Sequence, residues 1–176
     1  MKKILVVVDM QKDFVDGALG TPEAVSIIPN VVKKINDFDG DIFVTYDTHF
    51  DNYMETSEGK NLPVPHCIKG SEGWKLNSEV SEALADKEYI EVEKLTFGSV
   101  DLPALIKEKT ENEDFSIELI GLCTDICVVS NALILKANYP EVDISVDASC
   151  MAGVTPESHK AAITTMKMCQ IRVIGE

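Results

Sequence analysis

The stretch "SIELIGLCTDICVVSNALILKANY", residues 116–139, decides the fold of this chain. It begins as an apolar run over 116–122, typical of a buried strand, and continues as a helical pattern over 125–139. That helical pattern is apolar around nearly its whole circumference, so the helix should lie in the core or at a contact between subunits. A strand joined to a buried helix by a short turn is typical of α/β proteins.

The same alternation recurs along the rest of the chain. Further strands are predicted at 4–8, 41–46, 89–93, 143–148 and 171–174, and helices at 23–38, 76–87, 101–109 and 156–168. Most of the strand runs lack polar alternation, as in parallel strands that are buried on both faces. We therefore expect one domain, residues 1–176, with a three-layer αβα architecture and a six-stranded, mainly parallel Rossmann-like sheet.

Charge and composition exclude several classes of partner. The chain has 176 residues and a net charge of −14, which argues against binding to nucleic acids or anionic membranes. No apolar run reaches the ~18 residues of a membrane span, and the N-terminus becomes charged too soon for a signal peptide. We therefore expect a cytoplasmic protein whose five cysteines are reduced.

Chemically active side chains follow most of the predicted strands. They are Asp9, Asp47, Lys94, Cys123, Thr124, Asp125, Cys127 and Asp147. Each alone has an ordinary explanation, such as a turn residue, a surface cation or a structural cysteine. Ligands of such sheets bind at the carboxyl ends of the strands, so the set together predicts an active site at that edge.

Cys127 has the best setting for a nucleophile. With Thr124 or Asp125 as the helix N-cap, Cys127 falls in the first turn, where the helix dipole favours a thiolate. A nearby aspartate can take the thiol proton, and a lysine can stabilise the charge. A zinc site at Cys123 and Cys127 is less well supported, because the chain has no CxxC pair.

Five motifs carry a resemblance to a known family. They are "VVVDMQKDF" (6–14), "YDTH" (46–49), "PHC" (65–67), "VEKLTFGS" (92–99) and "GLCTDICV" (121–128). In this order, over nearly the whole chain, they resemble the isochorismatase-like cysteine hydrolases, specifically the nicotinamidase branch. The resemblance implies a six-stranded parallel sheet flanked by helices and a catalytic triad of Asp9, Lys94 and Cys127. It also implies hydrolysis of nicotinamide to nicotinate and ammonia through a Cys127 thioester, a step of NAD salvage.

The same resemblance implies the surroundings of the nucleophile. A non-proline cis peptide is expected at Leu122–Cys123, with the backbone N–H groups of Cys123 and Cys127 as an oxyanion hole. Phe14 and Gln11 are expected to contact the substrate.

A divalent metal ion, usually zinc, is also implied by the family. Its ligands would be Asp47, His49, His66 and one further residue within the long irregular stretch 47–73. Glu58 matches the family members that use Glu in that place, and Glu55 is the alternative by its spacing from Asp47. Oxygen and nitrogen ligands suit zinc, but also manganese or iron.

Some positions depart from the family pattern and leave the substrate open. Pro63 stands where an aromatic residue commonly contacts the substrate ring, and Lys12 replaces an Asn. Trp74, Phe50 and Phe97 are candidates for the missing ring contact. A second hypothesis is therefore that the chain is a cysteine hydrolase of the same family that acts on another small amide, such as an N-carbamoyl compound.

A third hypothesis, from another class of function, is that the chain is a nucleotide-binding or receiver-like module. No GxGxxG or GxxxxGK[ST] motif occurs, and a receiver would leave Cys127 and His66 without a role. Isochorismatase activity itself is disfavoured, because that branch does not use the thiol. The expected partners are a small amide substrate and further copies of the chain in a homo-oligomer, with no nucleic acid or membrane.

Overall fold

Six parallel strands form one sheet in the order β3-β2-β1-β4-β5-β6, within residues 1–111 and 113–176 that the computed structural model describes. The strands are β1 (Lys2–Val8), β2 (Asp41–Asp47), β3 (Tyr89–Lys94), β4 (Phe115–Leu122), β5 (Asp143–Ala152) and β6 (Arg172–Ile174). Each predicted strand is present, and the predicted parallel sheet is confirmed.

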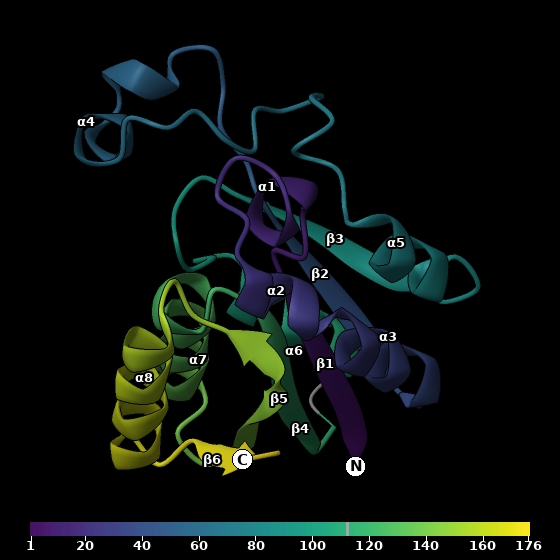
Figure 1. Cartoon of the computed structure of the whole chain (residues 1–176). Helices are drawn as coiled ribbons and strands as arrows, with labels where there is room; N and C mark the ends of the chain where they lie inside the picture. The colour runs from purple at the N-terminus through teal and green to yellow at the C-terminus, as the bar shows by residue number, and fades with distance from the viewer. Residues whose placement is uncertain (112) are drawn as a thin grey trace.

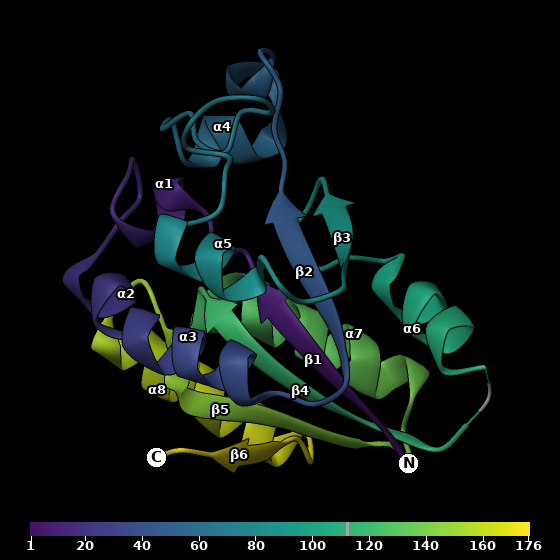
Figure 2. The same ribbon diagram turned by 90° about the vertical axis from the view of Figure 1, so that its right-hand side faces the viewer.

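Helices cover both faces of this sheet (Figures 1 and 2). On one face lie α2 (Pro22–Ser26), α3 (Ile28–Asp37) and α5 (Ser78–Leu84), and on the other lie α6 (Leu102–Thr110), α7 (Val129–Asn138) and α8 (Pro156–Met168). Among the described residues, no helix is long and apolar enough to cross a membrane. The three-layer αβα architecture is confirmed.

The central strand β1 shows why polar alternation is missing from the sequence. Leu5 and Val7 pack into the cluster that includes Val31 of α3, whereas Val6 and Val8 pack into the cluster on the opposite face. All four β1 side chains have no exposed surface. Because both faces are covered, every position of the strand from Ile4 to Val8 is apolar, whereas the two lysines lie at its less buried start.

Two of the predicted helices are interrupted. The pattern at 23–38 is divided into α2 and α3 at Ile27. Pro29, in the first turn of α3, has no backbone N–H that could donate to a carbonyl of the preceding turn, so one continuous helix cannot form. The pattern at 125–139 begins as one π-helical turn, η2 (Thr124–Val128), in which the Val128 N–H donates to the Cys123 carbonyl over 3.0 Å. Such turns are rare and often occur at functional sites.

The predicted N-cap of this helix is wrong, because both candidate side chains bind the neighbouring element instead. Thr124 Oγ1 lies 2.8 Å from His159 Nδ1 on α8. The Asp125 carboxylate accepts the Val154 N–H over 3.1 Å. Thr124 and Asp125 thus attach η2 to the region around α8.

The long stretch 47–73 is less irregular than expected. It contains η1 (Tyr53–Glu55) and α4 (Ser57–Asn61), and these two short helices, here called the arm, project beyond the end of β2 (Figures 1 and 2). Thr56 caps α4 by accepting the Gly59 N–H over 3.0 Å, and the buried Tyr53 hydroxyl donates to the Leu62 carbonyl over 2.8 Å. Another short helix, α1 (Lys12–Val15), follows β1.

The order of the strands defines where a ligand should bind. The direction of the chain across the sheet reverses between β1 and β4, and the crevice beyond the carboxyl ends at such a switch point is the usual ligand site. Asp147 does not reach this edge, because β5 continues to Ala152 and the Asp147 carboxylate pairs with Lys34 of α3 instead. The expectation that Asp147 joins the site is wrong.

Candidate active site

An acid, a cation and a thiol meet at the switch point. Asp9 follows β1, Lys94 ends β3, and Cys127 lies in the η2 turn after β4. Lys94 Nζ is 2.6 Å from Asp9 Oδ2 and 3.5 Å from Cys127 Sγ. All three side chains are buried, with exposed fractions of 0%, 3% and 4% for Asp9, Lys94 and Cys127.

The backbone and β2 orient Asp9. Its φ of 46° turns the chain out of β1, and its N–H donates to the Thr45 hydroxyl over 3.2 Å. That hydroxyl donates back to Asp9 Oδ1 over 2.6 Å. Oδ2 forms the ion pair with Lys94 but, among the described residues, has no hydrogen-bond donor in good geometry. One carboxylate oxygen therefore remains able to accept a proton.

Burial and charge set the protonation states of these groups. Burial raises the pKa of the Cys127 thiol, and the negative charge of Asp9 raises it further. Burial also raises the pKa of Asp9, although the Lys94 ammonium opposes this. Burial lowers the pKa of Lys94, but the charges of Asp9 and Cys127 outweigh burial and raise it. The lysine therefore stays charged, and Asp9 is a stronger base than an exposed carboxylate.

Cys123 stands at the start of the same turn but in a different environment. The Leu122–Cys123 peptide is cis, at the position that the family resemblance implies. Burial raises the pKa of the Cys123 thiol to about 12, and it also raises the pKa of the Cys127 thiol well above its ordinary value. The ammonium of Lys94 lies beside the sulfur of Cys127, which makes Cys127 the better nucleophile.

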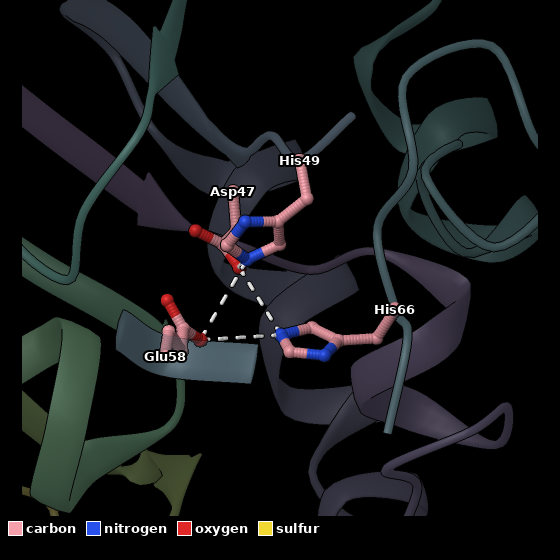
Figure 3. Close-up of side chains that lie close together, drawn as sticks. All are labelled: Asp47, His49, Glu58 and His66. Atoms are coloured by element: carbon pink, nitrogen blue, oxygen red, sulfur yellow. Dashed lines mark hydrogen bonds and ion pairs between the residues drawn. The ribbon is translucent and has the colours of Figure 1, made fainter. Parts of the chain in front are cut away.

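Four side chains converge next to this triad (Figure 3). Asp47 and His49 lie at the end of β2, Glu58 comes from the arm, and His66 comes from the segment that returns from it. One ligand atom from each residue lies within 4.8 Å of all the others. His66 Nε2 is 3.5 Å from both Asp47 Oδ2 and Glu58 Oε1, and His49 Nε2 is 3.0 Å from Asp47 Oδ2.

This geometry fits a divalent metal ion. A tetrahedral site with bonds of about 2.1 Å separates its ligand atoms by about 3.4 Å, close to the distances between these side chains. His66 Nδ1 lies 2.8 Å from the Val64 carbonyl, which directs Nε2 toward the cluster, as is common for metal ligands. Of the two candidate glutamates, Glu58 belongs to the cluster, whereas Glu55 is exposed on η1.

Without a metal ion, the cluster holds a proton. Burial lowers the pKa of His66, but hydrogen bonds to Asp47 and Glu58 outweigh it and raise the pKa to about 10. Burial raises the pKa of Asp47, but the two histidines lower it more, so that it lies below its usual range. The carboxylates thus require a positive charge here, and a divalent cation would satisfy the same requirement after displacing the proton.

Asp47 connects the two groups of residues. Its Oδ2 faces the histidines, while its Oδ1 lies 3.3 Å from Lys94 Nζ. A single carboxylate therefore links the four-residue cluster to the lysine beside Cys127.

A cavity of about 630 Å³ adjoins both Cys127 and the cluster. Its lining includes Cys127 and Cys123, all four residues of the cluster and several apolar side chains, namely Phe14, Leu19, Leu62, Leu95, Phe97 and Ile126. Of the three candidates for the missing ring contact, only Phe97 lines this cavity. Trp74 packs against Tyr46 with ring centroids 5.2 Å apart, and Phe50 lies outside the cavity with 48% of its surface exposed.

Gln11 does not take the place expected of it. Its amide nitrogen donates to the carbonyls of Asp47 and Trp74, both over 2.9 Å, and its amide oxygen accepts the Asp47 N–H over 2.8 Å. The side chain has no exposed surface and does not line the cavity. Gln11 therefore holds the end of β2 in place rather than contacting a substrate.

Sequence reasoning missed Thr45, which orients Asp9 from the middle of β2. Its signal is a polar residue within the otherwise apolar run "IFVTY". It also missed the arm residues Thr56, Ser57 and Asn61 that line the cavity. These have no distinctive pattern, because small polar residues are typical of any loop.

Comparison with known proteins gives a consistent result. The family model described as the isochorismatase domain matches residues 3–175. The chain belongs to the isochorismatase family. It is 30% identical over 177 residues to PncA of Bacillus subtilis (strain 168), described as an uncharacterized isochorismatase family protein, and the match covers 93% of each chain.

Solved structures extend this similarity. A crystal structure described as the nicotinamidase/pyrazinamidase PncA from Bacillus subtilis has a TM-score of 0.85 and 27% identity, covering 99% of this chain and 100% of that chain. The pyrazinamidase of Pyrococcus horikoshii in complex with zinc has a TM-score of 0.84 over 100% of both chains, and at 24% identity it supports the fold alone. The predicted nicotinamidase-like fold and the expectation of an amidohydrolase are confirmed.

Proposed function

We propose that this protein hydrolyses a small primary amide, with nicotinamide as the first candidate, to the carboxylic acid and ammonia. The observation that carries the proposal is the buried contact of Lys94 Nζ with both Cys127 Sγ and Asp9 Oδ2 beside a cavity of about 630 Å³. Similarity to nicotinamidase structures supports the same activity. In a cell, this reaction would return nicotinamide to NAD synthesis in the cytoplasm.

The first half of the reaction forms a thioester. Asp9 Oδ2 takes the Cys127 thiol proton while the Lys94 ammonium stabilises the thiolate. The sulfur attacks the amide carbonyl carbon, and the C–N bond then breaks. Asp9 returns its proton to the departing nitrogen, which leaves as ammonia. The N–H groups of Cys123 and Cys127 are proposed to bind the developing oxyanion.

The second half of the reaction regenerates the thiol. Water attacks the thioester carbonyl, Asp9 accepts a proton from it, and the C–S bond breaks to release the acid. The thiolate of Cys127 then takes the proton back from Asp9. The raised pKa of Asp9 suits a group that must both accept and donate a proton during the cycle.

Asp47, His49, Glu58 and His66 would hold a divalent metal ion, which we propose to be zinc on the basis of their nitrogen and oxygen donors. When bound, such an ion supplies a Lewis acid beside the substrate. His66 also packs against Phe14 with ring centroids 5.4 Å apart, so the cluster and the cavity wall share a contact.

Phe14 and Phe97 are proposed to contact the substrate ring. Phe14 is 8% exposed, whereas Phe97 is 44% exposed on the loop after β3. A stacked aromatic contributes about 1 kcal/mol beyond the area that it buries. The two rings would favour a flat amide such as nicotinamide.

A second candidate function is hydrolysis of a non-aromatic amide, such as an N-carbamoyl compound. It is favoured by Pro63, which is exposed and replaces an aromatic residue of the family pattern, and by the exposure of Phe97. The chemistry of Cys127 would be the same in both cases.

Ammonia release from a panel of amides tests the proposal. Nicotinamide should be hydrolysed, and benzamide, which lacks the ring nitrogen, should be hydrolysed more slowly if that nitrogen meets the metal cluster. Equal rates for the two amides would contradict a contact between the ring nitrogen and the cluster. Hydrolysis of an N-carbamoyl amide alone would reject the nicotinamidase activity and favour the second candidate.

A further inference from the structure

Asn131 of α7 joins the two walls of the cavity, although it does not line the cavity itself. It has no exposed surface, and every polar atom of its side chain is bonded. Its amide nitrogen donates to the Cys127 carbonyl over 2.8 Å and to the Phe97 carbonyl over 3.4 Å. Its amide oxygen accepts the Ser99 N–H over 2.9 Å. One amide thus binds both the nucleophile's turn and the loop that carries Phe97.

The loop also packs directly against α7 beside this amide. Gly98 is buried, and a Cβ added there would lie 2.5 Å from Ile134 Cδ1 and 3.2 Å from the Ser130 carbonyl carbon. The absence of a side chain at Gly98 therefore allows the backbone to approach the helix closely enough to reach Asn131. The Ser99 hydroxyl accepts the Leu102 N–H over 3.2 Å, so the far end of the loop is also fixed, at the start of α6.

This anchoring matters because the side chains of the loop have little support of their own. Leu95 and Phe97 are 68% and 44% exposed, yet both line the cavity. Their positions relative to Cys127 depend on the backbone, and the backbone is held by Asn131.

We propose that Asn131 is a positioning residue that determines substrate affinity by holding Phe97 at a fixed distance from the Cys127 turn. The inference rests on the proposed function in that it assigns the Phe97 wall to the binding of a flat amide.

The substitution Asn131→Leu removes all three hydrogen bonds at similar side-chain volume. The freed carbonyl and N–H groups regain water only if the loop moves away from α7. We expect KM for nicotinamide to rise about tenfold. The same substitution at Asn138, which is exposed on α7 and donates within the helix to the Ile134 carbonyl, should leave KM unchanged.

A double-mutant cycle separates positioning from a general loss of structure. In a Phe97→Ala background the ring is gone, so Asn131→Leu should raise KM less than twofold. Equal increases in KM with and without the Phe97 ring would overturn the proposal. If Asn131→Leu does not fold, Gly98→Ala serves in its place, because it displaces the same loop from α7 without touching Asn131.

Hydrogen exchange supplies a measurement that needs no substrate. The Ser99 N–H should be protected in the wild-type protein and in Asn138→Leu, and should exchange at least about tenfold faster in Asn131→Leu. Failure of nicotinamide turnover in the wild-type protein would reject the proposed function while this measurement still tests the anchor. Unchanged exchange in Asn131→Leu would overturn the inference independently of the substrate.

Discussion

Two lysines of this protein each lie between two carboxylates, and among the described residues only Lys94 of the two also contacts a cysteine sulfur. Lys94 Nζ is 2.6 Å from Asp9 and 3.3 Å from Asp47. Lys34 Nζ is 2.6 Å from Glu118 and 2.8 Å from Asp147. Cavity size does not distinguish the two, since a groove of about 590 Å³ adjoins Lys34 and one of about 630 Å³ adjoins Cys127.

The neighbours of each lysine make the difference. At Lys34, the Ser149 hydroxyl donates to Asp147 over 2.7 Å, and the lysine side chain keeps 25% of its surface exposed. At Lys94, the thiol of Cys127 completes the group, and Asp9 keeps an oxygen that can accept a proton. Paired charges alone therefore do not identify a catalytic group. Direct contact of the lysine with a thiol, together with a place at the switch point, distinguishes Lys94.

Among the variants that test this comparison, removal of the Cys127 thiol should lower activity the most. Cys127→Ala should lower kcat by at least about a thousandfold, since no other group can form the thioester. Cys123→Ala should retain most of the activity, because Cys123 is proposed to act through its backbone. Steady-state ammonia release measures both. Equal losses in the two variants would contradict the assignment of Cys127.

Removing the lysine charge beside the nucleophile should be nearly as damaging. In Lys94→Met the buried Asp9 carboxylate loses its counter-ion and takes up a proton, so it can no longer accept one from the thiol. We expect kcat to fall by about a hundredfold or more. The rate of Cys127 alkylation by iodoacetamide at pH 7 should fall as well. Retention of activity would mean that Lys94 is structural, like Lys34.

The candidate metal cluster of Asp47, His49, Glu58 and His66 should give the next largest effect. His66→Ala should reduce the metal content of the purified protein from about one per chain to near zero, with activity falling in parallel by roughly a hundredfold. Glu55→Ala is the matched control, since Glu55 is exposed outside the cluster, and it should retain its metal. Elemental analysis measures both. A wild-type protein without stoichiometric metal, and with activity unaffected by chelators, would show that the cluster is not a metal site.

Lys34→Met should have the smallest effect, a loss of about 1 kcal/mol of stability with kcat unchanged. Burial raises the pKa of Asp147, but hydrogen bonds from Lys34 and Ser149 lower it more, so it lies below its ordinary value of 3.8. A lowered carboxyl pKa contributes stability that is complete above 3.8 and lost as the pH falls through the folded pKa. Urea unfolding should therefore separate wild type from Lys34→Met at pH 7, and the difference should shrink below pH 3.8. A difference that does not depend on pH would mean that packing, not charge, is lost.

Much of the fold could be predicted because burial on both faces leaves a direct trace in the sequence. The apolar run Ile4–Val8 of β1 and the alternation of strands and helices predict the parallel sheet. The break at Ile27 was missed because a helical pattern continues across Pro29. The end of β5 was misplaced because Asp147 reads as the end of a strand, whereas its pairing with Lys34 allows the strand to continue.

Less of the site could be predicted. The residues that follow strands, Asp9, Lys94 and Cys127, could be grouped because parallel strands end at a common edge. The choice between Glu55 and Glu58 could not be made from spacing, because it depends on how η1 and α4 fold back toward β2. The family position of Gln11 likewise did not reveal that its amide is used entirely by the backbone.

The sequence by itself determined the architecture, the family and the set of reactive residues, because hydrophobic periodicity and short motifs are local properties of the chain. Only the tertiary structure decided which glutamate completes the cluster, and that Phe97 rather than Phe50 or Trp74 lines the cavity. Each of these depends on contacts between segments far apart in the chain. Such contacts form only when the sheet and its covering helices bring those segments together.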